Sequence, residues 1–367
     1  MPEIWLPYGD VDVPLDIRTE NLGELVENGT TALNHDQLLG RIKDLRINQD
    51  VKLVLPELTT NIMSILQLIL EKEDESRKIE IFCRQDDIDP LKKIFDSKRH
   101  HVLPLGSTDL DLFSRNQETS NILLTEVGFN PVYGFSGGPL SLAVAMSGDE
   151  KVELAVKKEL PTPGDEPPEN IWADSINSID EIIGVEVLPT GAGIQDVFVG
   201  DPIDTHRRAM ADYKKKHSYV IHEPARALLV SPGRGADRNL HSSLTAIWNS
   251  MQSIREGGTI CLVAECIDGL GSEALRLLAE GRLKGERSIR ESVSGREDVL
   301  FLSRAISRYN LILVSTIPLH YSREKLGFKI AKGVGDGLEQ ILDKHGSRTK
   351  ITVVPDASRT LLKSRKE

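Results

Sequence analysis

Hydrophobic positions in the first half of the chain follow the short runs typical of strands, interrupted by helical spacing. Two extended runs, 4–10 and 11–17, meet at a Gly-Asp turn and predict a hairpin. Apolar runs predict further strands at 51–55, 79–83 and 121–124. Helical patterns follow the first two of these runs, near 60–71 and 89–96. Such strand-then-helix units favour parallel pairing.

From about residue 224 the rhythm becomes regular. Buried-strand runs occur at 227–230, 259–263, 311–314 and 351–354. One helical face is formed by Leu240, Leu244, Ile247, Trp248, Met251 and Ile254, and Asp237 or Asn239 is available as the cap. Further helices are predicted at 273–280, 298–307 and 336–344. This alternation predicts a doubly wound sheet, whose ligand loops would begin at Ser231, Ala264 and Ser315.

The pattern therefore predicts an α/β protein of two α/β domains with a cleft between them, the second a doubly wound, mostly parallel sheet. We expect an N-terminal domain at 1–222 and a C-terminal domain at 223–350. A terminal strand and tail at 351–367 have no certain domain. The polar segment 217–224 ends in a proline and suits a hinge between the domains.

Composition and charge exclude several classes of protein. The net charge of −11 over 367 residues, with only short basic runs, argues against nucleic-acid binding. No apolar run approaches the roughly 18 residues that cross a bilayer, and the first residues carry no signal pattern, so we expect a cytoplasmic protein without membrane contact. Three cysteines without C-x-x-C spacing argue against disulfides and structural zinc.

A glycine-rich loop at 134–138 is the strongest local signal in the first half. Gly137 and Gly138 would let backbone N–H groups face a ligand, and the Ser136 hydroxyl adds a donor, which together suit an anion. A plain tight turn explains the same residues.

Two loops of the second domain carry polar residues to the predicted crevice. Ser231, Gly233 and Arg234 follow the first strand and could hold a carboxylate or phosphate, although the spacing is not that of a dinucleotide site. The next loop, 264–272, carries the acids Glu265 and Asp268 and the glycines Gly269 and Gly271. These acids could act as bases or cap the next helix. Gly333, Gly335 and Gly337 are assigned to backbone packing.

The histidines predict neither a metal site nor a proton shuttle. None of the nine shows H-x-H or H-E-x-x-H spacing, so no metal ligand and no catalytic residue is assigned.

Several segments together resemble the nickel-pincer lactate racemase family, in family order from residue 6 to 272. In the first half they are Leu6–Gly9, Gly134–Gly138, and Phe198–Pro202 leading to His206. In the second half they are Val230–Gly233, Gly257–Thr259, Ala264–Cys266 and Gly269–Ser272. The resemblance implies 2-hydroxy acid racemisation or epimerisation by a nickel-pincer cofactor tethered to lysine, with further histidines as nickel ligand, acid and base.

The chain departs from that family at each functional position. Pro139 and Leu140 stand where the resemblance expects Arg-Lys, the lysine being the tether. Asn130 and the segment 84–87 replace the two catalytic histidines, and no Asn-His pair follows residue 150. The substrate-binding segment reads Glu57–Asn61, keeping an acid and a threonine, Thr59, but no arginine. Ser242 and Thr245 replace a glutamine and a lysine.

These departures predict a divergent member without pincer chemistry, and no cofactor is expected because side chains cannot supply hydride chemistry. Its partner would be a small anionic, 2-hydroxy acid-like ligand in the interdomain cleft. The ligand residues would be Glu57, Thr59, Ser136, Gly137, Gly138, Ser231, Gly233, Arg234, Glu265, Gly269 and Gly271. One alternative is an active racemase or epimerase with an atypically held cofactor. Another is a non-enzymatic regulatory or interaction protein.

Overall fold

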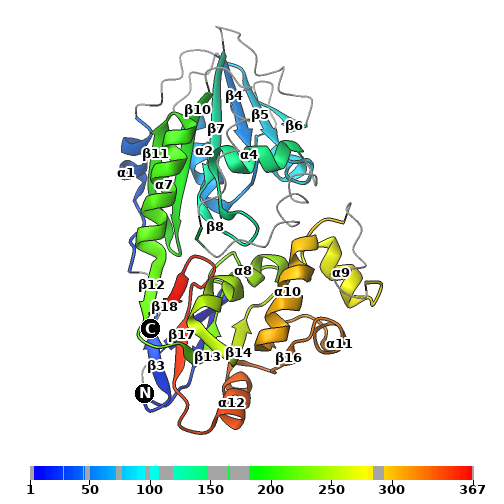
Figure 1. The fold of residues 1–367 in the computed structure, drawn as a ribbon. Coiled ribbons are helices and arrows are strands. Elements are labelled where there is room, and N and C mark those ends of the chain that lie inside the picture. The colour runs from blue at the N-terminus through cyan, green and yellow to red at the C-terminus, as the bar shows by residue number, and fades with distance from the viewer. Residues whose placement is uncertain are drawn as a thin grey trace. The chain divides into compact units, whose positions relative to one another are not determined.

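The chain divides into two compact α/β domains, labelled by element in Figure 1. A computed structural model describes residues 4–27, 29–43, 45, 50–71, 77–95, 100–106, 119–147, 164–165, 182–283 and 293–365. Thr30–Lys216 form what we call the central domain. Met1–Gly29 and His217–Glu367, which include both ends of the chain, form the terminal domain.

The central domain is built on a six-stranded sheet of order β11-β10-β7-β4-β5-β6. Its strands are β4 (Asp50–Leu55), β5 (Ile79–Cys83), β6 (His100–Pro104), β7 (Thr119–Glu126), β10 (Ile182–Thr190) and β11 (Gly193–Gly200). All pairs are parallel except β10 with β11. The helices are α1 (His35–Arg41), α2 (Thr60–Glu71), α3 (Ile88–Phe95, after the 3-10 turn Gln85–Asp87), α4 (Gly138–Ser147) and α7 (Pro202–His217).

Both faces of this sheet are buried. On β4, Leu53 and Leu55 pack in a cluster with α2, while Val54 between them packs in a second cluster with Leu142 of α4. Successive side chains of a strand point to opposite faces, so helices on both sides require strands that are apolar throughout. The continuous apolar runs in the sequence have this physical origin.

The terminal domain holds a second six-stranded sheet, of order β16-β15-β14-β13-β17-β3, and all its pairs are parallel. Its strands are β3 (Leu22–Leu25), β13 (Ala225–Val230), β14 (Ile254–Val263), β15 (Asn310–Val314), β16 (Lys329–Ile330) and β17 (Ile351–Val354). The helices are α8 (Leu240–Ser250, followed by the 3-10 turn Met251–Ser253), α9 (Glu273–Ala279), α10 (Arg296–Arg308), α11 (Leu319–Glu324) and α12 (Val334–His345). The chain winds from β13 to β16 and then crosses to β17 on the other side of β13. The predicted α/β class with a doubly wound, mostly parallel second sheet is confirmed.

The first 29 residues pack with the terminal domain, whereas the sequence assigned them to a domain at 1–222. The hairpin forms as predicted, from β1 (Ile4–Tyr8) and β2 (Val11–Leu15), and Ile4 and Leu6 enter the core of the terminal sheet. The strand β3 pairs with β17. The tail is also part of this domain, because β18 (Leu361–Ser364) pairs with β12 (Ser218–Ile221). The pairing of β3 with β17 joins residues more than 300 positions apart, and such a distance leaves no periodic trace in the sequence.

Local details correct two other predictions. The helix after β13 is capped by Asn239, whose side chain accepts from Ser242 N, but it ends at Ser250, and Ile254 begins β14. A Cβ on Gly337 would meet the Cys261 sulfur at 2.8 Å, so this glycine serves packing. Gly333 and Gly335 have open space around them, and the packing assignment is wrong for these two.

Within the described ranges, no helix combines the length and apolar character needed to span a membrane.

Candidate functional site

Two sequence-predicted residues of the central domain, Glu57 and Thr59, lie where β4 and β7 end. The Thr59 hydroxyl donates to Glu126 Oε2 at 2.7 Å. Glu57 Oε1 accepts hydrogen bonds from Glu126 N and from Ser141 Oγ, each at a donor–acceptor distance of 3.5 Å. Neighbouring parallel strands end at the same edge of the sheet, so residues far apart in sequence meet there.

A buried chain of polar groups continues from this edge into the domain. Thr125 Oγ1 donates to Glu186 Oε2 at 2.6 Å, and His206 Nδ1 lies 3.3 Å from Glu186 Oε1. Thr125, Glu186 and His206 are at most 1% exposed. Three glutamates, Glu57, Glu126 and Glu186, therefore gather at one end of the central sheet, next to the first turn of α4.

The glycine loop before α4 has positive φ angles at Gly134, Gly137 and Gly138. The Gly137 N–H donates to Ser141 Oγ at 2.8 Å, and the Gly138 N–H donates to Thr125 Oγ1 at 2.9 Å. These two N–H groups, predicted from sequence to face an anion, are satisfied within the domain. A tight turn that fixes α4 against the glutamates accounts for both glycines.

The pKa of Glu57 is raised from 4.5 to about 8, mainly by burial and then by the charges of Glu126 and Glu186. The Glu126 N–H and the Arg84 guanidinium act against this rise. At neutral pH the Glu57 carboxyl therefore keeps its proton and can donate a hydrogen bond. A carboxyl group that titrates near pH 8 suits binding or proton transfer near neutral pH.

In the terminal domain, the predicted loop residues Ser231 and Arg234 bind the N-terminal hairpin. The Ser231 hydroxyl donates to the Pro7 carbonyl at 2.7 Å, and Arg234 pairs with Asp12 at 2.7 Å. Gly233 has φ +94°, and its missing Cβ leaves room for the Asp356 carboxylate. These contacts lie beside β13 and β17, at the switch point of the sheet. The hairpin, which sequence analysis did not place here, occupies these residues.

The second predicted loop meets the hairpin turn. Glu265 lies against Gly9, where any Cβ would overlap its carboxylate. Burial raises the pKa of the Tyr8 hydroxyl, and the nearby Glu265, Cys266 and Asp237 raise it further. The Gly9 N–H donates to Asp237 Oδ2, while the buried Asp237 Oδ1 has no hydrogen-bond partner among the described residues.

The acids of this loop do not cap the following helix. The cap of α9 is Ser272, whose side chain accepts from Leu275 N. Asp268 pairs with Arg238 at 2.8 Å on the surface. Gly269 and Gly271 both have φ +78°, and a Cβ on Gly271 would overlap Asn239. The two glycines therefore shape the turn, and Gly271 also makes room for the cap of α8.

One further cluster has the spacing of metal ligands. Ligand atoms of His241, Glu297 and Asp298 lie within 4.8 Å of one another. Asp298 accepts from Ser272 Oγ at 2.6 Å and lies 2.8 Å from His241 Nδ1. These bonds join the first turns of α8 and α10 to the cap of α9, which is a structural use of the carboxylate.

Sequence reasoning missed Thr125, Glu126, Ser141 and Glu186, and it gave His206 no role. Glu186 carried a usable signal, because it stands between Val185 and Val187 in an otherwise apolar run. A charge in such a run is buried and needs partners.

Comparisons with known proteins support the resemblance to the lactate racemase family. A family model described as the lactate racemase C-terminal domain matches residues 227–361. The lactate racemase of Thermoanaerobacterium thermosaccharolyticum is 22% identical over 188 residues, a match that spans 49% of this chain and 44% of that protein. The structure of the lactate racemase apoprotein from the same organism aligns over all of both chains with a TM-score of 0.77 and 15% identity, which shows a shared fold.

Proposed function

We propose that this protein is a divergent lactate racemase-like protein that does not use a nickel-pincer cofactor. The observation that carries the proposal is the environment of Leu140, at the position that the resemblance gives to the tether lysine. Leu140 is 1% exposed and packs with Val132 and Tyr133 in an apolar cluster. A leucine has no amine to bond the cofactor, and its side chain is part of the core.

The other replaced positions also have structural roles. Asn130 Oδ1 accepts from Val132 N at 2.8 Å and from Tyr133 N at 3.0 Å, which fixes the turn between β8 (Gly128–Asn130) and β9 (Gly134–Ser136). Arg84 pairs with Asp87 at 3.3 Å. These groups supply neither the thioamide tether nor the histidine acid and base. The residues present do not fit the cofactor.

Protein produced together with the pincer-making enzymes is expected to contain no stoichiometric nickel and no covalent adduct, because Leu140 cannot form the link. Intact-mass spectrometry and metal analysis measure both. A mass increase with racemisation of lactate would instead support the alternative, an active racemase with an atypically held cofactor.

The ligand proposed for the central domain is a small anion of the 2-hydroxy acid type. Glu57, neutral at pH 7, can donate its proton to a carboxylate. It lies beside Ser141 in the first turn of α4, where the positive end of the helix dipole favours negative charge. Thr59, which is partly exposed, lies at the same edge, and Ser136, also partly exposed, directly precedes Gly137 of the glycine loop.

Binding of this kind would depend on pH. Above about pH 8, Glu57 is ionised and repels an anion, so millimolar D- or L-lactate is expected to raise the melting temperature at about pH 6.5 and not at about pH 9. Glu57→Gln stays neutral and should remove the difference between the two pH values. Absence of stabilisation by either enantiomer at both pH values would favour the non-enzymatic, ligand-free alternative.

A further inference from the structure

A basic pocket lies at the amino-terminal edge of the terminal sheet, opposite the loops that follow β13 and β14. Its volume is about 790 Å³, within the range of small-molecule sites. The lining comes from the starts of four neighbouring strands, β14, β13, β17 and β3, and from the segment after α12. Every lining residue belongs to the terminal domain.

Positive charge predominates in this pocket. Four cations line it, Arg226, Arg255, Arg348 and Lys350, against two carboxylates, Glu24 and Glu223. The whole chain has a net charge of −11, so this concentration of bases runs against the composition. Concave surfaces with one sign of charge concentrate ions of the other sign.

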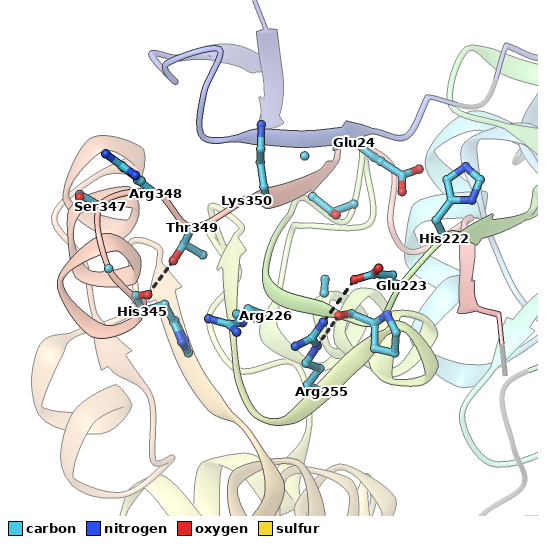
Figure 2. Close-up of a pocket in the computed structure, with 15 residues that line it drawn as sticks. Glu24, His222, Glu223, Arg226, Arg255, His345, Ser347, Arg348, Thr349 and Lys350 are labelled. Carbon is cyan, nitrogen blue, oxygen red and sulfur yellow. Dashed lines mark hydrogen bonds and ion pairs between the residues drawn. The ribbon is translucent and has the colours of Figure 1, made fainter. Parts of the chain in front are cut away.

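Two arginines are brought together by strand pairing. Arg226 and Arg255 each follow one residue of the aligned pair Ala225 and Ile254 on strands β13 and β14, and the register shifts directly after that pair. Figure 2 shows Arg226 between His345 and Arg255. Glu24, Glu223 and His222 lie toward the right-hand side of the pocket in this view. Burial lowers the pKa of His345, and the positive charges of the nearby Lys344 and Arg226 lower it further.

The internal contacts of Arg255 do not neutralise the pocket. Arg255 Nε donates to the Pro224 carbonyl at 2.8 Å, which holds the side chain in place. Its ion pair with Glu223 is 3.5 Å long, and the Glu223 side chain is 82% exposed. Exposed pairs of this length contribute little, so an incoming anion can compete with Glu223 for the guanidinium.

We propose that this pocket binds a phosphorylated, hydroxyl-bearing small molecule. The guanidinium forks of Arg226 and Arg255 match phosphate oxygens in geometry and charge. Glu24 and Glu223 on the other side can accept hydrogen bonds from hydroxyl groups of the same molecule. The site is separate from the 2-hydroxy acid site proposed for the central domain.

Titration calorimetry of the full chain with inorganic pyrophosphate at about 0.15 M salt tests the proposal. Pyrophosphate is expected to bind the unaltered chain, and Arg226→Glu is expected to weaken binding about tenfold or more. Arg304→Glu, which changes the same charge at an exposed position on α10, is the matched control and should bind like the unaltered chain.

Three results would overturn the proposal: no binding of pyrophosphate, equal weakening by Arg226→Glu and Arg304→Glu, or tighter binding of citrate than of pyrophosphate. The second result would show a general charge effect, and the third a polycarboxylate site. Arg255→Gln provides a second variant, and melting without ligand checks that each variant folds. Glu57→Gln should leave pyrophosphate binding unchanged, which separates this site from the proposed function.

Discussion

Gly137→Ala is expected to destabilise the central domain by about 3 kcal/mol or more, because two penalties coincide. The new Cβ would overlap Glu186 Oε1 and lie 2.9 Å from the Glu126 carbonyl oxygen. It would also stand at φ +101°, a backbone conformation that strains any residue with a Cβ. Urea denaturation followed by circular dichroism measures the free energy of unfolding.

Gly335→Ala is the matched control. Gly335 is an exposed residue of α12, and no neighbouring atom lies within 4 Å of the point where a Cβ would stand. Alanine there is expected to stabilise the protein by up to about 1 kcal/mol, since it favours the helix over glycine. Unchanged stability of Gly137→Ala would show that the loop relaxes away from Glu186. In that case the turn would not be required to hold α4.

Glu57→Gln is expected to make the protein more stable at about pH 8.5, by about 2–4 kcal/mol. The pKa of Glu57 in the folded protein is about 8, against 4.5 without the fold. Between these values the folded form keeps the proton that the unfolded form has released. Rising pH therefore lowers the free energy of unfolding across this window, and the stabilising effect of the proton is lost by about pH 8. The partial exposure of Glu57 reduces the effect below the full shift.

Urea denaturation at about pH 5, 7 and 8.5 measures this dependence. Glutamine has a similar shape and cannot ionise. In the variant, the free energy of unfolding should therefore no longer fall between about pH 5 and 8 as it does because of Glu57. Glu339→Gln, an exposed glutamate of α12, is the control and should follow the unaltered chain. Equal slopes for Glu57→Gln and the unaltered chain would contradict a protonated Glu57.

The candidate site shows where sequence reasoning reached its limit. Glu57 and Thr59 were found because they lie in a segment that resembles a known family. The partners of Glu57 were not found from the sequence, because Glu126 is 69 residues away and Glu186 lies on yet another strand. Ser231 and Arg234 have the residue types of an anion site, yet in the structure they bind the hairpin. The sequence did not predict this, because it does not reveal which donors are already satisfied.

The basic pocket illustrates the same limit. Arg226 and Arg255 stand at the starts of separate strands, and the 28 intervening residues hide their proximity until the strands pair. Lys350 joins them only because β17 returns beside β13.

The sequence by itself determined the local elements and the α/β class, because apolar runs and helical spacing are set by which faces must be buried. It also predicted that Leu140 and Asn130 do not serve a pincer cofactor, a prediction that rests on the family resemblance and on side-chain chemistry. Only the tertiary structure decided that the first 29 residues belong to the terminal domain and that three glutamates share one edge. These facts depend on strand order and pairing between distant segments, which periodicity within a short window does not record.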